Sequence, residues 1–300
     1  MKKTPISVRR WTTSASDNVA RQESELLGGD PGQGSSGKLF DNHFHINRMQ
    51  HWGMVWNRMQ HSENLKGGMA VFCDPHEMPS DGLLEQLSRD ALNVLVAVGI
   101  HPEHALIHPS TIQRALERIA LLKNQGKLHA IGEFGFDYTK AIPIKLQEEL
   151  VAAQLPLVAP LPLILHIRGN QRDTNNDIAY SHCLSFLRGK IQSDQKIQLH
   201  SFFGSREQVI QWSRVFPNTF FSISGLIKHA SNVQKDGLKA VPLSKLLFET
   251  DSPYLAVKPR SKNSPSNLNE VIHLVSELRK KTPEELCQAN SRNSKAIFNW

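Results

Sequence analysis

Short, nearly continuous apolar runs recur along the chain from Leu39 onward, and most end at a polar residue. Apolar, β-prone runs of this length are typical of strands buried on both faces of a sheet. The chain has eight of them, at residues 39–45, 69–73, 94–100, 129–134, 161–166, 196–200, 219–224 and 245–250.

The segments between these runs carry helical signals. Thr282-Pro283-Glu284-Glu285 reads as a capping box with proline at the first helical position. Residues 147–161 should form the helix before the fifth run, but Pro156 and Pro160 predict that it kinks or ends early. Eight alternating units predict a (β/α)8 TIM barrel, and a doubly wound open sheet is the alternative.

Residues 1–37 differ from the rest of the chain. They include Asp-Pro-Gly-Gln-Gly-Ser-Ser-Gly at positions 30–37 and show no sustained apolar periodicity. We therefore expect a flexible tail or linker over 1–37, dispensable for chemistry, and a single barrel domain over 38–300.

Composition narrows the class of protein. Charged residues make up 21% of the 300 residues, which is ordinary globular usage and excludes collagen-like, coiled-coil and wholly disordered chains. No apolar run is long enough to span a membrane, and no apolar core follows the basic N-terminus as in a secretory signal. The three widely spaced cysteines form no disulfide framework. We expect a nuclear or cytoplasmic protein that is not secreted, and the net charge of +7 suits a polyanionic partner.

Acidic and histidine side chains stand at the ends of six of the eight runs. In a (β/α)8 barrel these ends meet at one face, where active sites lie. A single histidine there is more often structural than a metal ligand, but so many at one mouth argue against coincidence. The set fits a pair of divalent cations bridged by a carboxylate. Its members are His43, His45, His101, Glu133, His166, His200 and Asp251.

Several segments together resemble the TatD family of metal-dependent nucleases, from Leu39 to the end of the chain. The Phe-Cys-Asp-Pro run at 72–75 and the N-terminal extension resemble the animal branch of the family. The resemblance rests on residues 40–45, 98–102, 130–138, 161–168, 199–205, 221–225 and 246–255. It implies an amidohydrolase-like (β/α)8 barrel that hydrolyses the phosphodiester bonds of DNA, with RNA as a second candidate. It also implies 3′–5′ exonuclease activity, a role in DNA repair and a two-metal mechanism.

The resemblance also assigns roles. His43, His45 and Asp251 would hold one ion, His166 and His200 the other, and Glu133 would bridge them. Glu133 and Asp251 would be catalytic, the latter as general base. His101 and Arg168 would approach the phosphate, and Asp137 would support the ligands. The ions are expected to be Mg²⁺ or Mn²⁺, with Zn²⁺ as a third candidate. Asn47 and Ser201 depart from the family pattern at positions that are not ligands.

Basic residues follow several of the predicted strands and would guide a phosphate backbone. They are Arg168, Arg172, Lys228, Lys258, Arg260 and Lys262, of which Lys258, Arg260 and Lys262 are predicted substrate contacts beside His101 and Arg168. Trp52 and Trp56 could stack on bases, but their spacing favours helix packing. We expect a nucleic acid as partner, no membrane association and a monomer.

Two other functions compete with a nuclease. The first is a small-molecule amidohydrolase of the same barrel superfamily, although many of these use a carbamylated lysine where this chain has Glu133. The second is a nucleic-acid-binding barrel without catalysis, which the complete ligand set disfavours. The sequence leaves open the choice between DNA and RNA and the identity of the metal.

Overall fold

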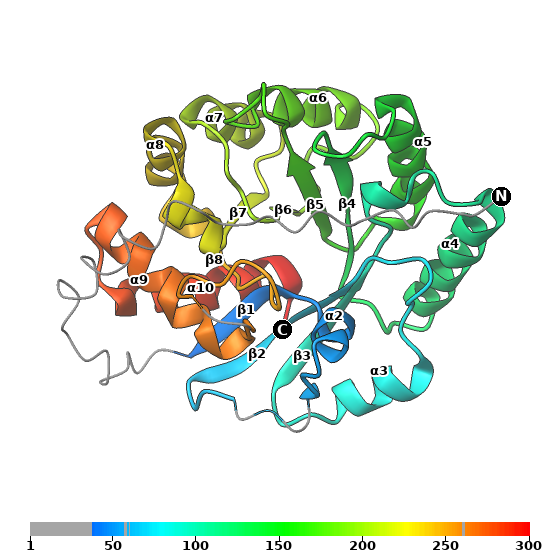
Figure 1. Ribbon diagram of the computed structural model, residues 1–300, viewed down its shortest axis with the longest axis horizontal. Helices are drawn as coiled ribbons and strands as arrows, with labels where there is room; N and C mark the ends of the chain where they lie inside the picture. Colours follow the sequence, from blue (N-terminus) through cyan, green and yellow to red (C-terminus); the bar gives the residue numbers. More distant parts are fainter. Residues whose placement is uncertain (1–37, 57–58, 60, 260–261) are drawn as a thin grey trace, which may run out of the picture. The chain divides into compact units, whose positions relative to one another are not determined.

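The computed structural model describes residues 38–56, 59, 61–259 and 262–300. The predicted tail at 1–37 and the predicted substrate contact Arg260 lie outside the described residues. Every apolar run overlaps a strand, which confirms the predicted fold (Figure 1). The strands are β1 Leu39–Phe44, β2 Leu65–Phe72, β3 Asn93–Val98, β4 Ala130–Asp137, β5 Leu163–Arg168, β6 Ile197–Leu199, β7 Thr219–Ile223 and β8 Leu246–Phe248.

All neighbouring strands are parallel and follow one another in chain order from β1 to β8. The ring then closes, because the Asp251 amide donates to the His43 carbonyl at 3.0 Å and the His45 amide donates to the Ser252 carbonyl at 2.8 Å. A doubly wound sheet would instead reverse its strand order at a switch point. The chain is therefore a TIM barrel, and its closing hydrogen bonds involve the predicted metal ligands themselves.

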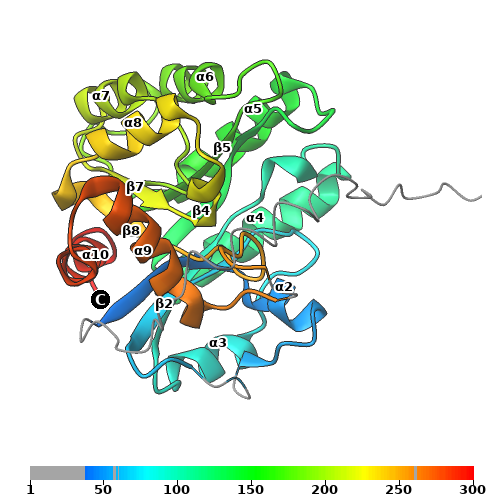
Figure 2. The ribbon, with the colours of Figure 1, turned by 60° about the vertical axis from the view of Figure 1, so that its left-hand side comes forward.

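Helices surround the strands (Figures 1 and 2). As Pro156 predicts, α5 stops before it and a short 3₁₀ turn at Leu155–Leu157 follows. The Thr282 capping box opens α10 as expected. None of the described helices has the length and hydropathy needed to cross a bilayer. The helices are α2 Ile46–His51, α3 Asp81–Ser88, α4 Pro109–Asn124, α5 Ile144–Gln154, α6 Asp177–Leu187, α7 Arg206–Val215, α8 Asn232–Ala240, α9 Leu268–Arg279 and α10 Pro283–Phe298.

The barrel interior has its own apolar cluster, separate from the larger one between strands and helices. Val71, Ala97, Ile164 and Leu247 belong to it, from four different strands. Trp300, which follows α10, stacks on Phe40 of the same cluster at 4.4 Å between ring centroids. Helix α10 packs beside β1 and β8 (Figures 1 and 2).

Two glycines let β4 approach β5 closely. Gly132 and Gly135 have φ of +141° and +150°, which L side chains rarely adopt. A Cβ at Gly135 would lie 2.1 Å from the carbonyl oxygen of His166, and one at Gly132 would lie 2.4 Å from that of Ile164. The strand that carries Glu133 can therefore sit against the strand that carries His166 only with glycine at these positions.

This contact generates a stability prediction. Gly135→Ala should lower the free energy of unfolding by about 3 kcal/mol, because it adds backbone strain and overpacking. Gly82→Ala is the matched control, since a Cβ there meets open space in helix α3. That change should be neutral or stabilise by up to about 1 kcal/mol. Urea unfolding followed by circular dichroism measures both, and equal midpoints for the two variants would contradict the role of Gly135.

Candidate metal centre

Strand alternation, together with register shifts in two strands, brings the predicted ligands to the centre of the barrel mouth. Successive side chains of a strand face opposite sides, so residues two apart face the same side. Ile164 lies in the interior apolar cluster, and a step of two along β5 reaches His166. Leu247 lies in the same cluster, and steps of two reach Glu249 and then Asp251. His166, Glu249 and Asp251 therefore continue the inward-facing rows above the apolar floor. His43 and Glu133 lie three residues after the interior residues Phe40 and Ala130, and the pairing register shifts in β1 and β4 over these stretches.

Four side chains form the first group of donor atoms. His43 Nε2 lies 3.2 Å from Glu133 Oε2 and 3.3 Å from His45 Nε2. His45 Nε2 lies 3.3 Å from Asp251 Oδ1. Two ligands of one ion, each about 2.1 Å from it, are separated by about 3.0–3.4 Å at octahedral or tetrahedral angles. The spacing of these atoms therefore suits a shared cation.

The second group contains His166, His200 and again Glu133. His200 Nε2 lies 3.4 Å from Glu133 Oε2, and His166 Nδ1 lies 3.9 Å from Glu133 Oε1. The ligand atoms of His43, His45 and Glu133 lie within 4.8 Å of one another, and so do those of Glu133, His166 and His200. Glu133 thus belongs to both groups, as a bridging carboxylate would.

Unpaired interior atoms test whether a cation fits. Both ring nitrogens of His166 and Glu133 Oε2 are buried without a hydrogen-bond partner among the described residues. Asp137 Oδ2 is 3.6 Å from His166 Nε2, longer than a hydrogen bond. Buried polar atoms normally have a partner, so these atoms fit a cation that they would ligate. Imidazole and carboxylate donors together suit Zn²⁺ and Mn²⁺ and also accept Mg²⁺.

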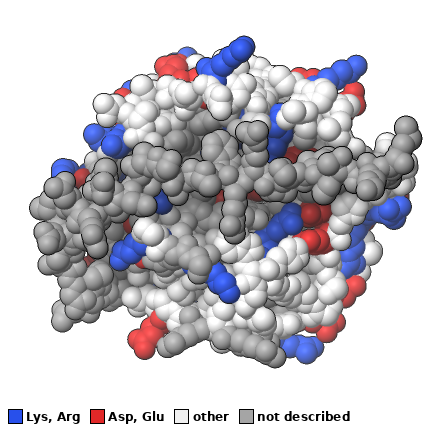
Figure 3. Space-filling view, viewed as in Figure 1, with Lys and Arg blue, Asp and Glu red and all other residues white. Residues whose placement is uncertain are grey.

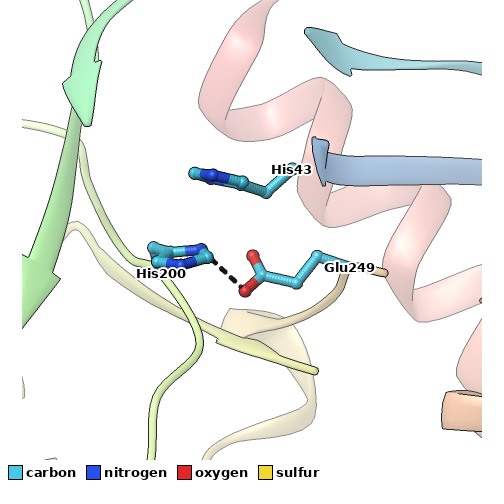
Figure 4. A group of neighbouring side chains, drawn as sticks. All are labelled: His43, His200 and Glu249. Carbon is cyan, nitrogen blue, oxygen red and sulfur yellow. Dashed lines mark ion pairs between the residues drawn. The ribbon is translucent and has the colours of Figure 1, made fainter. Parts of the chain in front are cut away.

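Acceptor groups at the far side of two rings direct a lone pair toward the centre. His45 Nδ1 lies 3.1 Å from the Val71 carbonyl, which can only accept, so the proton is on Nδ1. His200 Nδ1 lies 2.9 Å from Glu249 Oε1, which likewise places a proton on Nδ1 (Figure 4). In both rings Nε2 is then the nitrogen that can bind an ion.

His101 has the opposite arrangement. Its Nδ1 accepts a hydrogen bond from the Glu103 amide at 3.2 Å, so the neutral ring carries its proton on Nε2. Burial, followed by the nearby His166, holds its pKa well below the ordinary value and keeps the ring neutral. Nε2 lies 3.8 Å from Glu133 Oε1. His101 therefore presents a hydrogen-bond donor at the site, which distinguishes it from the ligand rings.

The carboxylates remain ionised despite their burial. Burial alone would raise the pKa of Glu133, but the imidazoles of His200 and His43 lower it well below its ordinary value. Burial likewise opposes ionisation of Asp251, and His200 and His45 lower its pKa. Burial would lower the pKa of His200, but Glu249, Glu133 and Asp251 raise it to about 9. A cation that binds His200 would take the place of a proton that this ring holds.

Glu249 is the main site residue that the sequence analysis did not identify. Its Oε1 accepts from the Ser201 amide at 2.6 Å, and its Oε2 accepts from Gln198 Nε2 at 3.0 Å. Both oxygens are thus already engaged, and Glu249 orients His200 rather than offering a ligand. Figure 4 shows the His43 and His200 rings lying one above the other, with centroids 3.8 Å apart. The spacing Glu249-Thr250-Asp251 was the available signal, since residues two apart face the same side.

The predicted substrate contacts lie at different depths. Arg168 lines the cavity of about 470 Å³ above the ligands, and its Nη1 is buried without a hydrogen-bond partner among the described residues. Lys258 and Lys262 are exposed and do not line that cavity. Lys258 lies 3.9 Å from Glu270, and Lys228 donates to the backbone carbonyl of Ala256 at 2.8 Å.

Two further cations line the cavity, and both are paired with acids. Arg48 Nη2 lies 2.9 Å from Asp74, and Lys140 lies 3.4 Å from Glu103. Where the face in Figure 3 is visible, lysines and arginines are scattered among acidic side chains. Among the described residues that line the cavity, Arg168 is thus the one arginine or lysine without an acidic partner.

Residues 40–299 match the protein family described as TatD related DNase. The chain belongs to this family. A human relative named 3′-5′ RNA nuclease TATDN2 is 28% identical over 223 residues, covering 72% of this chain and 28% of its own length. The chain thus spans less than a third of that relative. A relative from Erwinia tasmaniensis named 3′-5′ ssDNA/RNA exonuclease TatD is 28% identical over 212 residues, or 67% of this chain and 76% of the relative.

The crystal structure of YJJV, a TatD homolog from Escherichia coli K12, has the same fold. It superposes with a TM-score of 0.69 at 23% identity, covering 88% of this chain and 99% of that one. Membership of the TatD family makes this chain a metal-dependent hydrolase, in agreement with the sequence analysis.

The role of Glu249 is testable without an activity assay. In Glu249→Gln the charge that fixes the proton of His200 on Nδ1 is lost, so affinity for Mn²⁺ should fall by about 10–100-fold. Calorimetric titration of the metal-free protein measures this. The exposed Glu277→Gln is the control, and thermal melts of both variants detect any loss of folding. Identical Mn²⁺ isotherms for the two variants would show that Glu249 does not act through His200.

Proposed function

We propose that this chain is a metal-dependent 3′–5′ exonuclease of single-stranded DNA or RNA that uses two divalent ions. The observation that carries the proposal is Glu133, a buried carboxylate shared by two groups of imidazole donors within 4.8 Å. The names of the human and Erwinia relatives support the direction of cleavage and the class of substrate. Glu133, where a lysine would favour an amidohydrolase, supports a phosphodiester substrate.

The side chains around the phosphate would have different roles in the proposed reaction. Divalent ions bound to the two groups would polarise the phosphodiester and lower the pKa of water to near neutrality. Asp251, ionised at neutral pH, can accept the proton of the attacking water. His101 Nε2–H can donate to a non-bridging oxygen, and the unpaired Arg168 Nη1 can neutralise developing charge.

A digestion assay tests the function. Single-stranded DNA, single-stranded RNA and duplex DNA, each labelled at the 5′ end, are incubated with Mg²⁺, Mn²⁺ or Zn²⁺, or with EDTA. We expect a ladder that shortens from the 3′ end with single strands and metal, and no cleavage with EDTA. Hydrolysis of small amides or esters without oligonucleotide cleavage would instead indicate an amidohydrolase. Tight oligonucleotide binding without cleavage under any metal would indicate an inactive binding barrel.

The variant Asp251→Asn tests whether Asp251 acts in the chemical step or in substrate binding. Asp251→Asn should lower kcat by about a hundredfold or more, because it removes the proton acceptor. Oligonucleotide affinity, measured by fluorescence anisotropy, should stay the same or rise, since a negative charge near the phosphate is lost. Asp194→Asn, at an exposed position, is the matched control and should retain wild-type kcat. A loss of affinity with unchanged kcat would contradict the role of Asp251.

Glu133 tests the number of ions. Glu133→Gln removes the negative charge common to both groups while keeping the side-chain volume. The number of ions bound per chain, measured by elemental analysis after dialysis against Mn²⁺, should fall from two toward one or fewer, and cleavage should fall to background. Two tightly bound ions in the variant would show that Glu133 does not bridge them, and one ion in the wild type would contradict the two-metal proposal.

A further inference from the structure

A groove of about 530 Å³ adjoins the metal cavity, with a size within the range of small-molecule binding pockets. Three residues, Arg168, Asp251 and Tyr254, line both spaces. The groove is therefore continuous with the site where the phosphate would react.

The groove walls combine an aromatic surface with apolar and polar side chains. Tyr254 is 42% exposed, and Phe203, Leu226 and Leu255 supply further apolar surface. Asn170 and Thr174 are exposed at the groove and offer hydrogen-bonding groups. Flat aromatic surface beside amide and hydroxyl groups suits a nucleobase, which has an aromatic face and polar edges.

The wall formed by the loop after β5 is held in place before any ligand binds. Asp173 accepts hydrogen bonds from the Ile178 and Ala179 amides at 3.1 and 3.0 Å. The Gly169 amide donates to Asn176 Oδ1 at 2.6 Å. Such preorganisation lowers the entropic cost of binding.

The facing wall is braced as well. Lys228 on the loop after β7 donates to the Ala256 and Val257 carbonyls at 2.8 and 3.3 Å. Gly225 lies so near the carbonyl of Leu255 that a Cβ would come within 1.9 Å of it. The loops after β7 and β8 are therefore packed against each other, and the groove has two fixed sides.

Arg168 gives the groove its charge. It lies at the junction of the two spaces, with Nη1 buried and without a hydrogen-bond partner among the described residues. A guanidinium next to an aromatic groove matches a phosphate joined to a base. Arg48 and Lys140 also line the metal cavity, but each is paired with an acid.

We propose that this groove binds one unstacked nucleobase of a nucleotide flanking the scissile phosphate, with Tyr254 as its stacking surface. This proposal rests on the proposed nuclease function. It gives a physical reason for a single-strand preference, because the base must leave any duplex to enter the groove. Stacking accepts every base, so little sequence preference should result.

The test removes the base rather than the protein contact alone. Single-stranded DNA oligonucleotides carry a tetrahydrofuran abasic nucleotide at the terminal or the penultimate 3′ position. For the wild-type full chain, the abasic change at one of these positions should lower kcat/KM about tenfold, mainly through KM, within the usual range for base stacking. In Tyr254→Ala the ratio between the intact and abasic substrates should fall to about one. Because the ratio is internal to each variant, a general loss of activity cancels.

Two further variants serve as controls for Tyr254→Ala. Tyr254→Phe keeps the ring and should keep the tenfold ratio. Trp52 is also exposed and meets Tyr254 edge-on at 6.2 Å, but it lines neither cavity. Trp52→Ala should therefore keep the ratio as well. If Trp52→Ala abolishes the ratio while Tyr254→Ala preserves it, the base binds elsewhere and the proposal is wrong.

Failure of this proposal is distinguishable from failure of the nuclease proposal. Equal cleavage of the intact and both abasic oligonucleotides by the wild type would overturn the base site and leave the nuclease function standing. If no nucleic acid is cleaved, bis(p-nitrophenyl) phosphate shows whether phosphodiester chemistry is present at all. The base site is then tested by fluorescence anisotropy with phosphorothioate-protected versions of the same oligonucleotides. Tighter binding of the intact than of the abasic oligonucleotide, with the difference lost in Tyr254→Ala, supports the base site. Equal affinity of the wild type for the intact and abasic oligonucleotides overturns it.

Discussion

One buried carboxylate, Glu133, organises the mouth of the barrel. Its oxygens lie 3.2–4.0 Å from nitrogens of five histidines: His43, His45, His101, His166 and His200. A charge in the interior is tolerated only when it is paired, so the carboxylate and the imidazoles depend on one another. The glycines of β4 and the closure of β1 against β8 are the backbone features that make this convergence geometrically accessible.

The group that contacts Nδ1 of each histidine determines whether its Nε2 can bind an ion or donate a proton. A carbonyl behind His45 and a carboxylate behind His200 both place the proton away from the centre, which leaves a lone pair for an ion. A backbone amide behind His101 has the reverse effect and leaves a proton facing the site. Rings of one residue type thus divide into ligands and a donor through single polar contacts, and this division suits a centre that binds cations and a phosphate side by side.

Much of this arrangement could be predicted from the sequence because it follows from strand ends. In a parallel barrel the inward side chains at those ends must meet, so the apolar runs and the polar residues that terminate them indicate both the fold and the set His43, His45, Glu133, His166, His200 and Asp251. Glu249 follows the same alternation, but the sequence analysis did not identify it. The run Leu-Leu-Phe-Glu-Thr-Asp contains two acids two residues apart, and the ligand role was assigned to Asp251.

The loop residues were less predictable because the direction of a loop side chain depends on contacts distant in sequence. Trp52 and Trp56 are four apart, yet Trp56 is buried against Phe44 while Trp52 is 43% exposed beside Tyr254. Lys228 follows a strand end, as a substrate contact would, but its ammonium group bonds to backbone carbonyls of the next loop. A count of basic residues after strands therefore overestimates the charge that faces a substrate.

The two kinds of site residue also tolerate change differently. Loss of one buried ligand leaves its partners with unpaired charge in the barrel interior, so the cost extends to the whole cluster. Exposed loop residues such as Lys258 and Lys262 are solvated on their own, and their replacement disturbs little else. Between these extremes lie Arg168 and Tyr254, which border both the ligands and the open groove. Variation at such positions can change which substrate is held while the metal-binding core stays intact, so specificity is expected to depend on them.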